Sequence, residues 1–252
     1  MKKLPNAPLQ EVIFEVRWLL DVDEETNLSF DPNFEFALGK FYSSIESEGL
    51  SEIKRKVPKE VPPQFLNYKT IYQFVSGENK WPLMQLGPGI FTVNDTEKNY
   101  HWDETYLPLI KKGLKLLNEA YKTDQEFIFA SLRYIDTINV NEYGFDGDWQ
   151  KFIADNLNVT FNNLYDTRGA LNNLQFNQEF LLEDNSNLQI SISNGKTQRD
   201  KQPLLIWQTG ISKKQDFDYE ALIDWLVRSH EITSELFKEL VKPELYDSFK
   251  KT

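Results

Sequence analysis

The chain has 252 residues, 39 acidic and 28 basic side chains, and a formal net charge of −11 at pH 7. Its length allows one large or two small domains with a substantial core, and a composition of 40% hydrophobic and 14% aromatic residues excludes an intrinsically disordered chain. The absence of cysteine excludes disulfides, thiolate metal sites, iron–sulfur clusters and cysteine nucleophiles.

The first half of the chain contains one strand, a helix, a group of strands and a second helix. Alternating apolar and polar residues predict a half-buried strand over residues 11–18, and apolar residues spaced three and four apart predict helices over residues 31–49 and from residue 104 onward. Between the helices, proline and glycine separate three extended runs, which predict an antiparallel meander: residues 52–57, 68–75 and 83–93.

The second half repeats this order. A long strand is predicted over residues 127–140, a short helix over residues 149–157 and a long amphipathic helix over residues 219–241, which ends at Pro243. Three further strands are expected between the two helices: residues 173–183, 188–193 and 204–212. Both halves, residues 1–124 and 125–252, therefore follow the order βαβββα. We expect an α+β fold of two similar halves, in which antiparallel sheets are backed by long helices and an internal duplication accounts for the repeat.

The number of histidines and the length of the apolar stretches limit which metal sites and membrane segments the chain can form. The two histidines, His101 and His230, cannot form a three-histidine zinc site, and neither lies in a His-Glu-x-x-His pattern. We predict no metal site and no cofactor, although the abundant carboxylates leave magnesium or manganese binding open. No apolar stretch approaches the roughly 20 residues of a membrane span, and the amino terminus lacks the apolar core of a signal peptide, so we expect a cytoplasmic protein.

Charge argues against general nucleic-acid binding. A net charge of −11 repels phosphate backbones. One basic segment could act against this repulsion, and it consists of Lys54, Arg55 and Lys56 with Lys59. Such a segment is more typical of a solvated loop or an edge strand than of a nucleic-acid site.

Polar residues around positions 85–102 form the first candidate site. Gly87, Pro88 and Gly89 separate two extended runs and favour a bulge or turn over a ligand contact, because no helix and no lysine follow as in a phosphate loop. Asn94 opens the densest cluster of small polar and aromatic side chains, which suits a polar ligand. The same residue types also suit the loop before a helix, with Asp103 as its N-cap.

The strand over residues 127–140 contains the second candidate. Asp136 lies on the same face of this strand as the apolar residues Leu132 and Ile138, because side chains alternate along a strand, so we expect its carboxylate to be partly buried. A buried carboxylate either has a partner or has a raised pKa. Arg17 or Arg133 would pair with it only if a strand bends, since Arg133 has the opposite parity. We favour a structural ion pair over a catalytic acid. His230 is interpreted as a packed helical residue, because no Gly-x-Ser-x-Gly pattern supports a serine hydrolase.

Three segments resemble a sporadically distributed, uncharacterised family of bacterial proteins: NAPLQEVIFEVRW (residues 6–18), QLGPGIFTVN (residues 85–94) and LRYID (residues 132–136). The resemblance spans nearly the whole chain, and its opening segment is the most specific part. The family occurs in only some bacteria, in a pattern that resembles that of mobile-element or phage-defence genes. This resemblance implies a gene neighbourhood, and it implies no catalytic residues.

The sequence favours a non-catalytic binding or regulatory protein, with an unknown protein or small molecule as its partner. This hypothesis rests on the missing nucleophile and metal signatures and on the abundant aromatic residues. The candidate ligand-binding residues are Arg17, Trp18, Asn94, Arg133 and Asp136. The alternative is an enzyme that uses Asp136 with Glu11 or Glu15 and a divalent metal on a phosphate ester or nucleotide. A homo-oligomeric scaffold is a third hypothesis.

Overall fold

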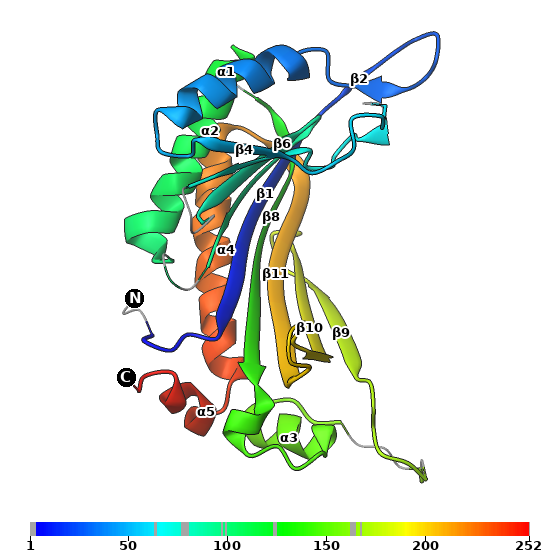
Figure 1. Ribbon diagram of the computed structural model, residues 1–252, viewed down its shortest axis with the longest axis vertical. Coiled ribbons are helices and arrows are strands. Elements are labelled where there is room, and N and C mark those ends of the chain that lie inside the picture. Colours follow the sequence, from blue (N-terminus) through cyan, green and yellow to red (C-terminus); the bar gives the residue numbers. More distant parts are fainter. Residues whose placement is uncertain are drawn as a thin grey trace. The chain divides into compact units, whose positions relative to one another are not determined.

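The computed structural model describes residues 4–62, 65–76, 81–96, 98, 100–122, 125–161, 165–166 and 168–251 (Figure 1). The chain divides into two compact units. Unit 1 comprises Met1–Gln10, Arg133–Ile211 and Arg228–Thr252, and unit 2 comprises Glu11–Leu132 and Ser212–Val227. No helix among these residues is both long and apolar enough to cross a membrane.

The fold is α+β, as predicted, with a large antiparallel sheet and several helices. The strands hydrogen bond in the order β4-β5-β6-β7-β1-β8-β11-β10-β9. β1, β8, β11 and the helix α4 each contribute residues to both units. The strands of the sheet are β1 (Leu9–Trp18), β4 (Glu52–Arg55), β5 (Tyr72–Val75), β6 (Leu83–Gly87), β7 (Ile90–Asp95), β8 (Phe127–Asn139), β9 (Gln175–Leu181), β10 (Asn187–Lys196) and β11 (Pro203–Phe217).

The remaining elements are short strands and helices. β2 (Asp21–Val22) and β3 (Ser29–Phe30) pair only with each other. The helices are α1 (Phe34–Glu46), α2 (Leu107–Tyr121), α3 (Trp149–Asn156), α4 (Tyr219–Leu240) and α5 (Pro243–Ser248), with a π-helical turn η2 (Trp102–Tyr106) and a 3₁₀ turn η3 (Val140–Tyr143). The predicted order is correct for the second half, to which α5 adds a short helix.

The meander of the first half contains one strand more than predicted. The single run expected over residues 83–93 forms β6 and β7, which pair with each other because Pro88 and Gly89 make a turn between them. Gly89 has a φ of +74°, and a Cβ on Gly87 would lie 1.9 Å from the carbonyl oxygen of Lys69. The turn predicted for the Gly-Pro-Gly segment is therefore confirmed, and both glycines are required by backbone geometry.

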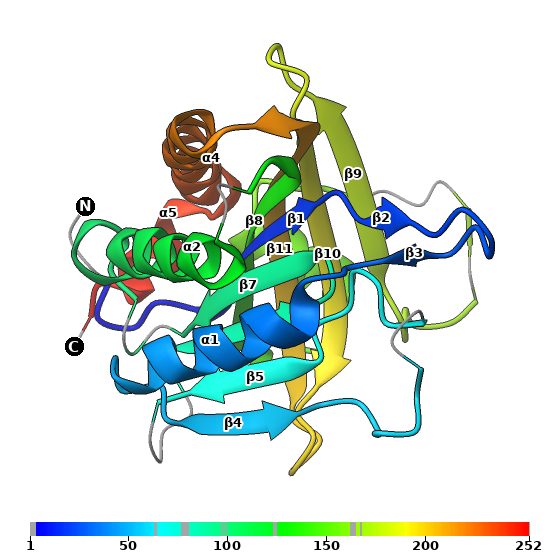
Figure 2. The same cartoon turned by 90° about the horizontal axis from the view of Figure 1, so that it is seen from above.

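In unit 2, α1 and α2 pack on one face of the strands β5, β6, β7 and β1 (Figure 2). Phe41 of α1 meets Phe74 of β5 and Phe91 of β7, with ring centroids 5.2 and 5.7 Å apart. Gly113 of α2 lets that helix approach the sheet, since a Cβ there would lie 2.8 Å from the ring of Phe91. The even-numbered residues of β1 from 12 to 18 are buried, which confirms the predicted strand face.

The start of the second predicted helix differs from the expected one. Asp103 does not cap it; His101 does, because its Nδ1 accepts a hydrogen bond from the Glu104 backbone nitrogen at 3.3 Å. One π-helical turn, η2, then leads into α2, which has a proline in its first turn. The π-helical turn thus begins at Trp102, two residues before the predicted helix start at residue 104, whereas α2 itself begins three residues after it, at Leu107.

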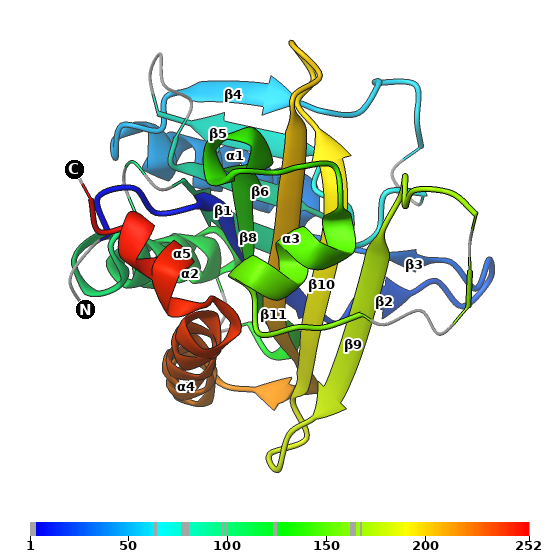
Figure 3. The same cartoon turned by 90° about the horizontal axis from the view of Figure 1, so that it is seen from below.

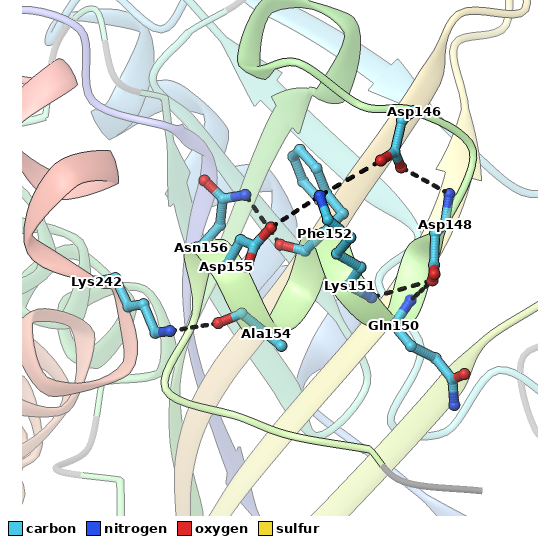
Figure 4. Close-up of polar contacts among 9 residues, drawn as sticks. All are labelled: Asp146, Asp148, Gln150, Lys151, Phe152, Ala154, Asp155, Asn156 and Lys242. Carbon is cyan, nitrogen blue, oxygen red and sulfur yellow. Dashed lines mark hydrogen bonds and ion pairs between the residues drawn. The ribbon is translucent and has the colours of Figure 1, made fainter.

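In unit 1, the core lies between the strands β8, β10 and β11 and the helices α3, α4 and α5 (Figure 3). Trp207 of β11 stacks near Phe237 of α4, with ring centroids 6.4 Å apart. Figure 4 shows how α3 is fixed: the Asp148 carboxylate accepts hydrogen bonds from the backbone nitrogens of Gln150 and Lys151. At the other end of α3, the Lys242 ammonium donates to the Ala154 carbonyl.

Candidate functional site

The face of unit 2 that points away from α1 and α2 carries a chain of hydrogen-bonded polar side chains. Gln73 Nε2 of β5 donates to Gln85 Oε1 of β6 at 2.8 Å, and Gln85 Nε2 donates to Thr92 Oγ1 of β7 at 3.1 Å. Asn94 Oδ1 accepts from Thr92 Oγ1 at 2.9 Å, and Asn94 Nδ2 donates to Glu11 Oε1 of β1 at 2.7 Å. Five side chains on four adjacent strands are thereby held in fixed orientations. We call this set the amide ladder.

Strand register explains why these residues meet. Gln73 is paired with Gln85 and Gln85 with Thr92, so their side chains leave the same face of neighbouring strands. Asn94 lies two residues beyond Thr92 and is 3% exposed. Polar groups this deeply buried need hydrogen-bond partners, and the ladder supplies them.

A pocket of about 270 Å³ opens beside the ladder, within unit 2. Glu11, Gln73 and Gln85 line it together with Lys54 of β4 and Trp81, and Val75 and Leu83 complete its wall. It is slightly smaller than the roughly 300–1,000 Å³ typical of pockets for drug-sized ligands, so its occupant would be a small molecule.

Two acceptor atoms of the residues that line this pocket are not used by the ladder. Among the described residues, nothing hydrogen bonds to Gln73 Oε1 or to Glu11 Oε2. The Lys54 ammonium is already paired with Glu52 at 3.0 Å. The lining therefore combines two acceptor oxygens, one of them on a carboxylate, with the paired ammonium of Lys54 and the indole of Trp81.

Arg17 and Asn94, two of the predicted ligand-binding residues, lie on this same face of the sheet. The Arg17 guanidinium forms an ion pair with Glu15 at 2.6 Å, and its Cζ lies 4.7 Å from the centre of the Phe129 ring and 5.8 Å from that of Tyr68. Arg17 is thus held by a carboxylate and two aromatic rings at the β1 end of the face, and it does not line the pocket.

Trp18 lies on the opposite, helix-covered face and contributes to the core of unit 2. Its Nε1 donates to Asp31 Oδ2 at 3.3 Å, and its ring packs edge-on against Tyr121. The same Asp31 oxygen accepts from Tyr121 Oη at 2.7 Å and from the Gly89 backbone nitrogen at 3.4 Å. Burial and the neighbouring Asp31 carboxylate raise the pKa of Tyr121, which keeps its hydroxyl protonated as a donor.

Arg133 and Asp136 belong to unit 1. Arg133 is exposed, whereas Asp136 is 4% exposed on the apolar face of β8, as its parity predicted. The expected ion pair is not formed by any residue that the structure describes, since the Asp136 carboxylate makes no salt bridge or hydrogen bond within that set. Instead, burial raises the pKa of Asp136 to about 8. The carboxyl group is therefore mostly protonated at neutral pH.

Two residues before Asp136 on the same face, Tyr134 is hydrogen bonded to α4. Its Oη lies 2.9 Å from His230 Nδ1. Ser229 and Thr233, on the same helix, are both 2% exposed, and Thr233 Oγ1 donates to the Ser229 carbonyl at 2.8 Å. His230 is packed and hydrogen bonded, as interpreted from the sequence.

The carboxylates do not assemble into a metal centre within the described part of the chain, where no three acidic or histidine side chains are close enough to share an ion. The acidic residues around α3 show what they do instead. Asp148 caps the helix, while Asp146 and Asp155 both pair with Lys151, at 3.4 and 3.2 Å (Figure 4). The enzyme hypothesis, which combined Asp136 with Glu11 or Glu15 and a metal, gains no support from these groupings.

Sequence reasoning missed most of the pocket. Gln73, Gln85 and Trp81 were not singled out, although each glutamine sits at a solvent-parity position inside a strand. The sequence predicts a solvated loop or an edge strand around Lys54, and β4 is an edge strand of the sheet. The useful signal was the pairing of two glutamines across a predicted meander, which becomes visible only when the strand register is known.

Comparison of the chain with protein-family models, curated proteins and solved structures gives no match.

Proposed function

We propose that the protein is a non-catalytic binding protein whose unit 2 pocket holds a small molecule rich in hydrogen-bond donors, such as a polyol, a sugar or an amine. The observation that supports this most directly is the amide ladder, which fixes polar side chains of Gln73, Gln85 and Glu11 along the pocket. Groups that are already oriented lose little conformational entropy when a ligand binds.

The ligand class follows from the atoms that remain after the ladder has formed. The open atoms Gln73 Oε1 and Glu11 Oε2 both accept hydrogen bonds, so a ligand should donate to them. The Glu11 carboxylate disfavours an anion, and the Trp81 indole offers an apolar surface to the carbon skeleton of a sugar ring. A neutral or cationic molecule of about monosaccharide size meets these conditions.

Ligand-dependent melting tests the proposal. The chain is titrated with a panel of monosaccharides, sugar alcohols and diamines while its thermal unfolding is followed. A ligand present at 100 times its dissociation constant adds about 2.7 kcal/mol to the free energy of unfolding, which corresponds to roughly 5–10 °C in Tm for a chain of this size.

Matched variants identify the site. Gln73→Ala and Glu11→Gln should abolish the ligand-induced rise in Tm, because each removes an acceptor atom from the pocket. Gln178→Ala changes an exposed glutamine of β9 in unit 1 and should leave the rise unchanged. The proposal is wrong if no member of the panel raises Tm, or if Gln73→Ala and Gln178→Ala respond alike.

A further inference from the structure

A second pocket in unit 2 is dominated by lysine. It has a volume of about 780 Å³ and lies along the outer face of α2. Its lining consists of Lys111, Lys112, Lys115 and Lys122, one carboxylate, Glu119, and Asn118 with Tyr219, the first residue of α4. This volume falls within the range typical of small-molecule sites. The pocket shares no lining residue with the one beside the amide ladder.

Helical periodicity brings the lysines to one side of α2. Lys111 and Lys115 are four positions apart, close to one full turn of α2, and Lys122 is the left-handed C-cap at the end of the helix, so the three lysines form a stripe that continues to the C-terminus of α2. The opposite side of the helix carries Ile110, Leu114 and Leu117, which are buried in the core. The stripe therefore faces outward along its whole length.

Only part of this positive charge is compensated. Lys112 pairs with Glu48 of α1, and Lys115 lies 3.8 Å from Glu119, with 74% of its side chain exposed. Lys111 and Lys122 form no ion pair with any described residue. In a chain of net charge −11, this leaves a concentrated region of positive charge.

α1 adds a fifth cation beside the pocket. Figure 2 shows α1 next to α2, and Lys40 of α1 lies near Lys122. Desolvation and then the neighbouring Lys122 lower the pKa of Lys40. Among the residues that the structure describes, neither Lys40 nor Lys122 forms an ion pair, so the two ammonium groups repel each other, and a bound anion would relieve that repulsion.

Tyr219 adds an exposed aromatic ring to the charged lining of the pocket. Its ring is 39% exposed, and it lines the same pocket as the lysines. A planar aromatic group of a ligand can stack on such a ring while the attached phosphates meet ammonium groups. The overall negative charge of the chain favours a compact anion over a long nucleic acid, because the remaining phosphates of a long nucleic acid would be repelled.

We propose that the α2 lysine pocket binds a nucleotide, with the phosphates on Lys111, Lys115 and Lys122 and the base on Tyr219. This inference is independent of the ligand proposed for the other pocket. It assigns a binding site and no chemical reaction.

Equilibrium binding to the full chain tests this inference, with ATP, inorganic triphosphate and adenosine as probes and no added divalent cation. ATP should bind most tightly, triphosphate more weakly, and adenosine not measurably at millimolar concentration. Raising the salt concentration should weaken ATP binding several-fold, because lysine–phosphate contacts release counterions. The proposal is overturned if neither ATP nor triphosphate binds, or if a single-stranded oligonucleotide binds more tightly than ATP.

Substitutions on the helix surface locate the site. Lys111→Gln and Lys122→Gln should each weaken ATP binding about tenfold, whereas Lys238→Gln, an exposed lysine of α4 in unit 1, should not. Tyr219→Ala should weaken ATP binding about fivefold but leave triphosphate binding unchanged, and Tyr219→Phe should retain the affinity for ATP. Equal losses of ATP and triphosphate in Tyr219→Ala would contradict the assignment of the base. Circular dichroism melting checks that each variant is folded.

Discussion

The buried carboxyl group of Asp136 makes the stability of the protein depend on pH in a defined direction. Burial raises its pKa from 3.8 to about 8, so the folded chain keeps a proton that the unfolded chain releases above pH 3.8. The free energy of unfolding therefore falls as pH rises through the window from 3.8 to about 8 and levels off above it. Below this window both states are protonated, and the group costs nothing.

The size of the effect follows from the shift. Inside the window, one proton is released on unfolding, which lowers the stability by about 1.4 kcal/mol per pH unit. Asp136→Asn keeps the shape of the protonated carboxyl group and cannot ionise. Between about pH 5 and pH 7.5, the stability of Asp136→Asn relative to the native chain should therefore rise by about 3 kcal/mol.

Urea denaturation of both proteins at half-unit steps of pH measures this difference. The control is Asp224→Asn, which makes the same chemical change at an exposed residue of α4. Parallel pH profiles for Asp136→Asn and the native chain would refute the reasoning, since they would mean that the carboxyl group ionises as easily in the folded state as in the unfolded one.

Two further predictions concern unit 2. Asp31→Ala should lower the free energy of unfolding by about 2–4 kcal/mol in urea titrations, because it leaves three hydrogen-bond donors without their acceptor. Tyr121→Phe should lower it by about 1 kcal/mol, because it removes only one of these donors. Equal losses in the two variants would contradict the role of Asp31 as a shared acceptor. Gly39→Ala should stabilise α1 by about 0.5–1 kcal/mol, since nothing lies within 4 Å of the new Cβ. Gly113→Ala, whose Cβ would lie 2.8 Å from the ring of Phe91, should be less stable than Gly39→Ala by about 1–3 kcal/mol in the same assay, and equal midpoints would refute this packing argument.

The sequence by itself determined most of the strands and helices and the burial of individual faces, although it did not separate β6 from β7 and did not indicate α5. The alternation in β1 and β8 placed Val12, Phe14 and Asp136 on buried faces, because side chains on a strand point to opposite sides in turn. The spacing of apolar residues located α4, and the turn at Gly89 followed from the need for a positive φ. These properties depend on backbone geometry over a few consecutive residues, so they can be inferred from the local sequence.

Only the tertiary structure decided which polar residues meet. Gln73, Gln85 and Asn94 are separated by 12 and 9 positions, and their contact depends on the register of three strands. The partner of Trp18 is Asp31, and the environment of Asp136 is a core without a described counter-ion, although the sequence favoured an ion pair. Hydrogen bonds and ion pairs act over a few ångströms between residues that are distant in the chain, so the sequence indicates which groups need partners, while the packing of strands and helices decides which partners they obtain.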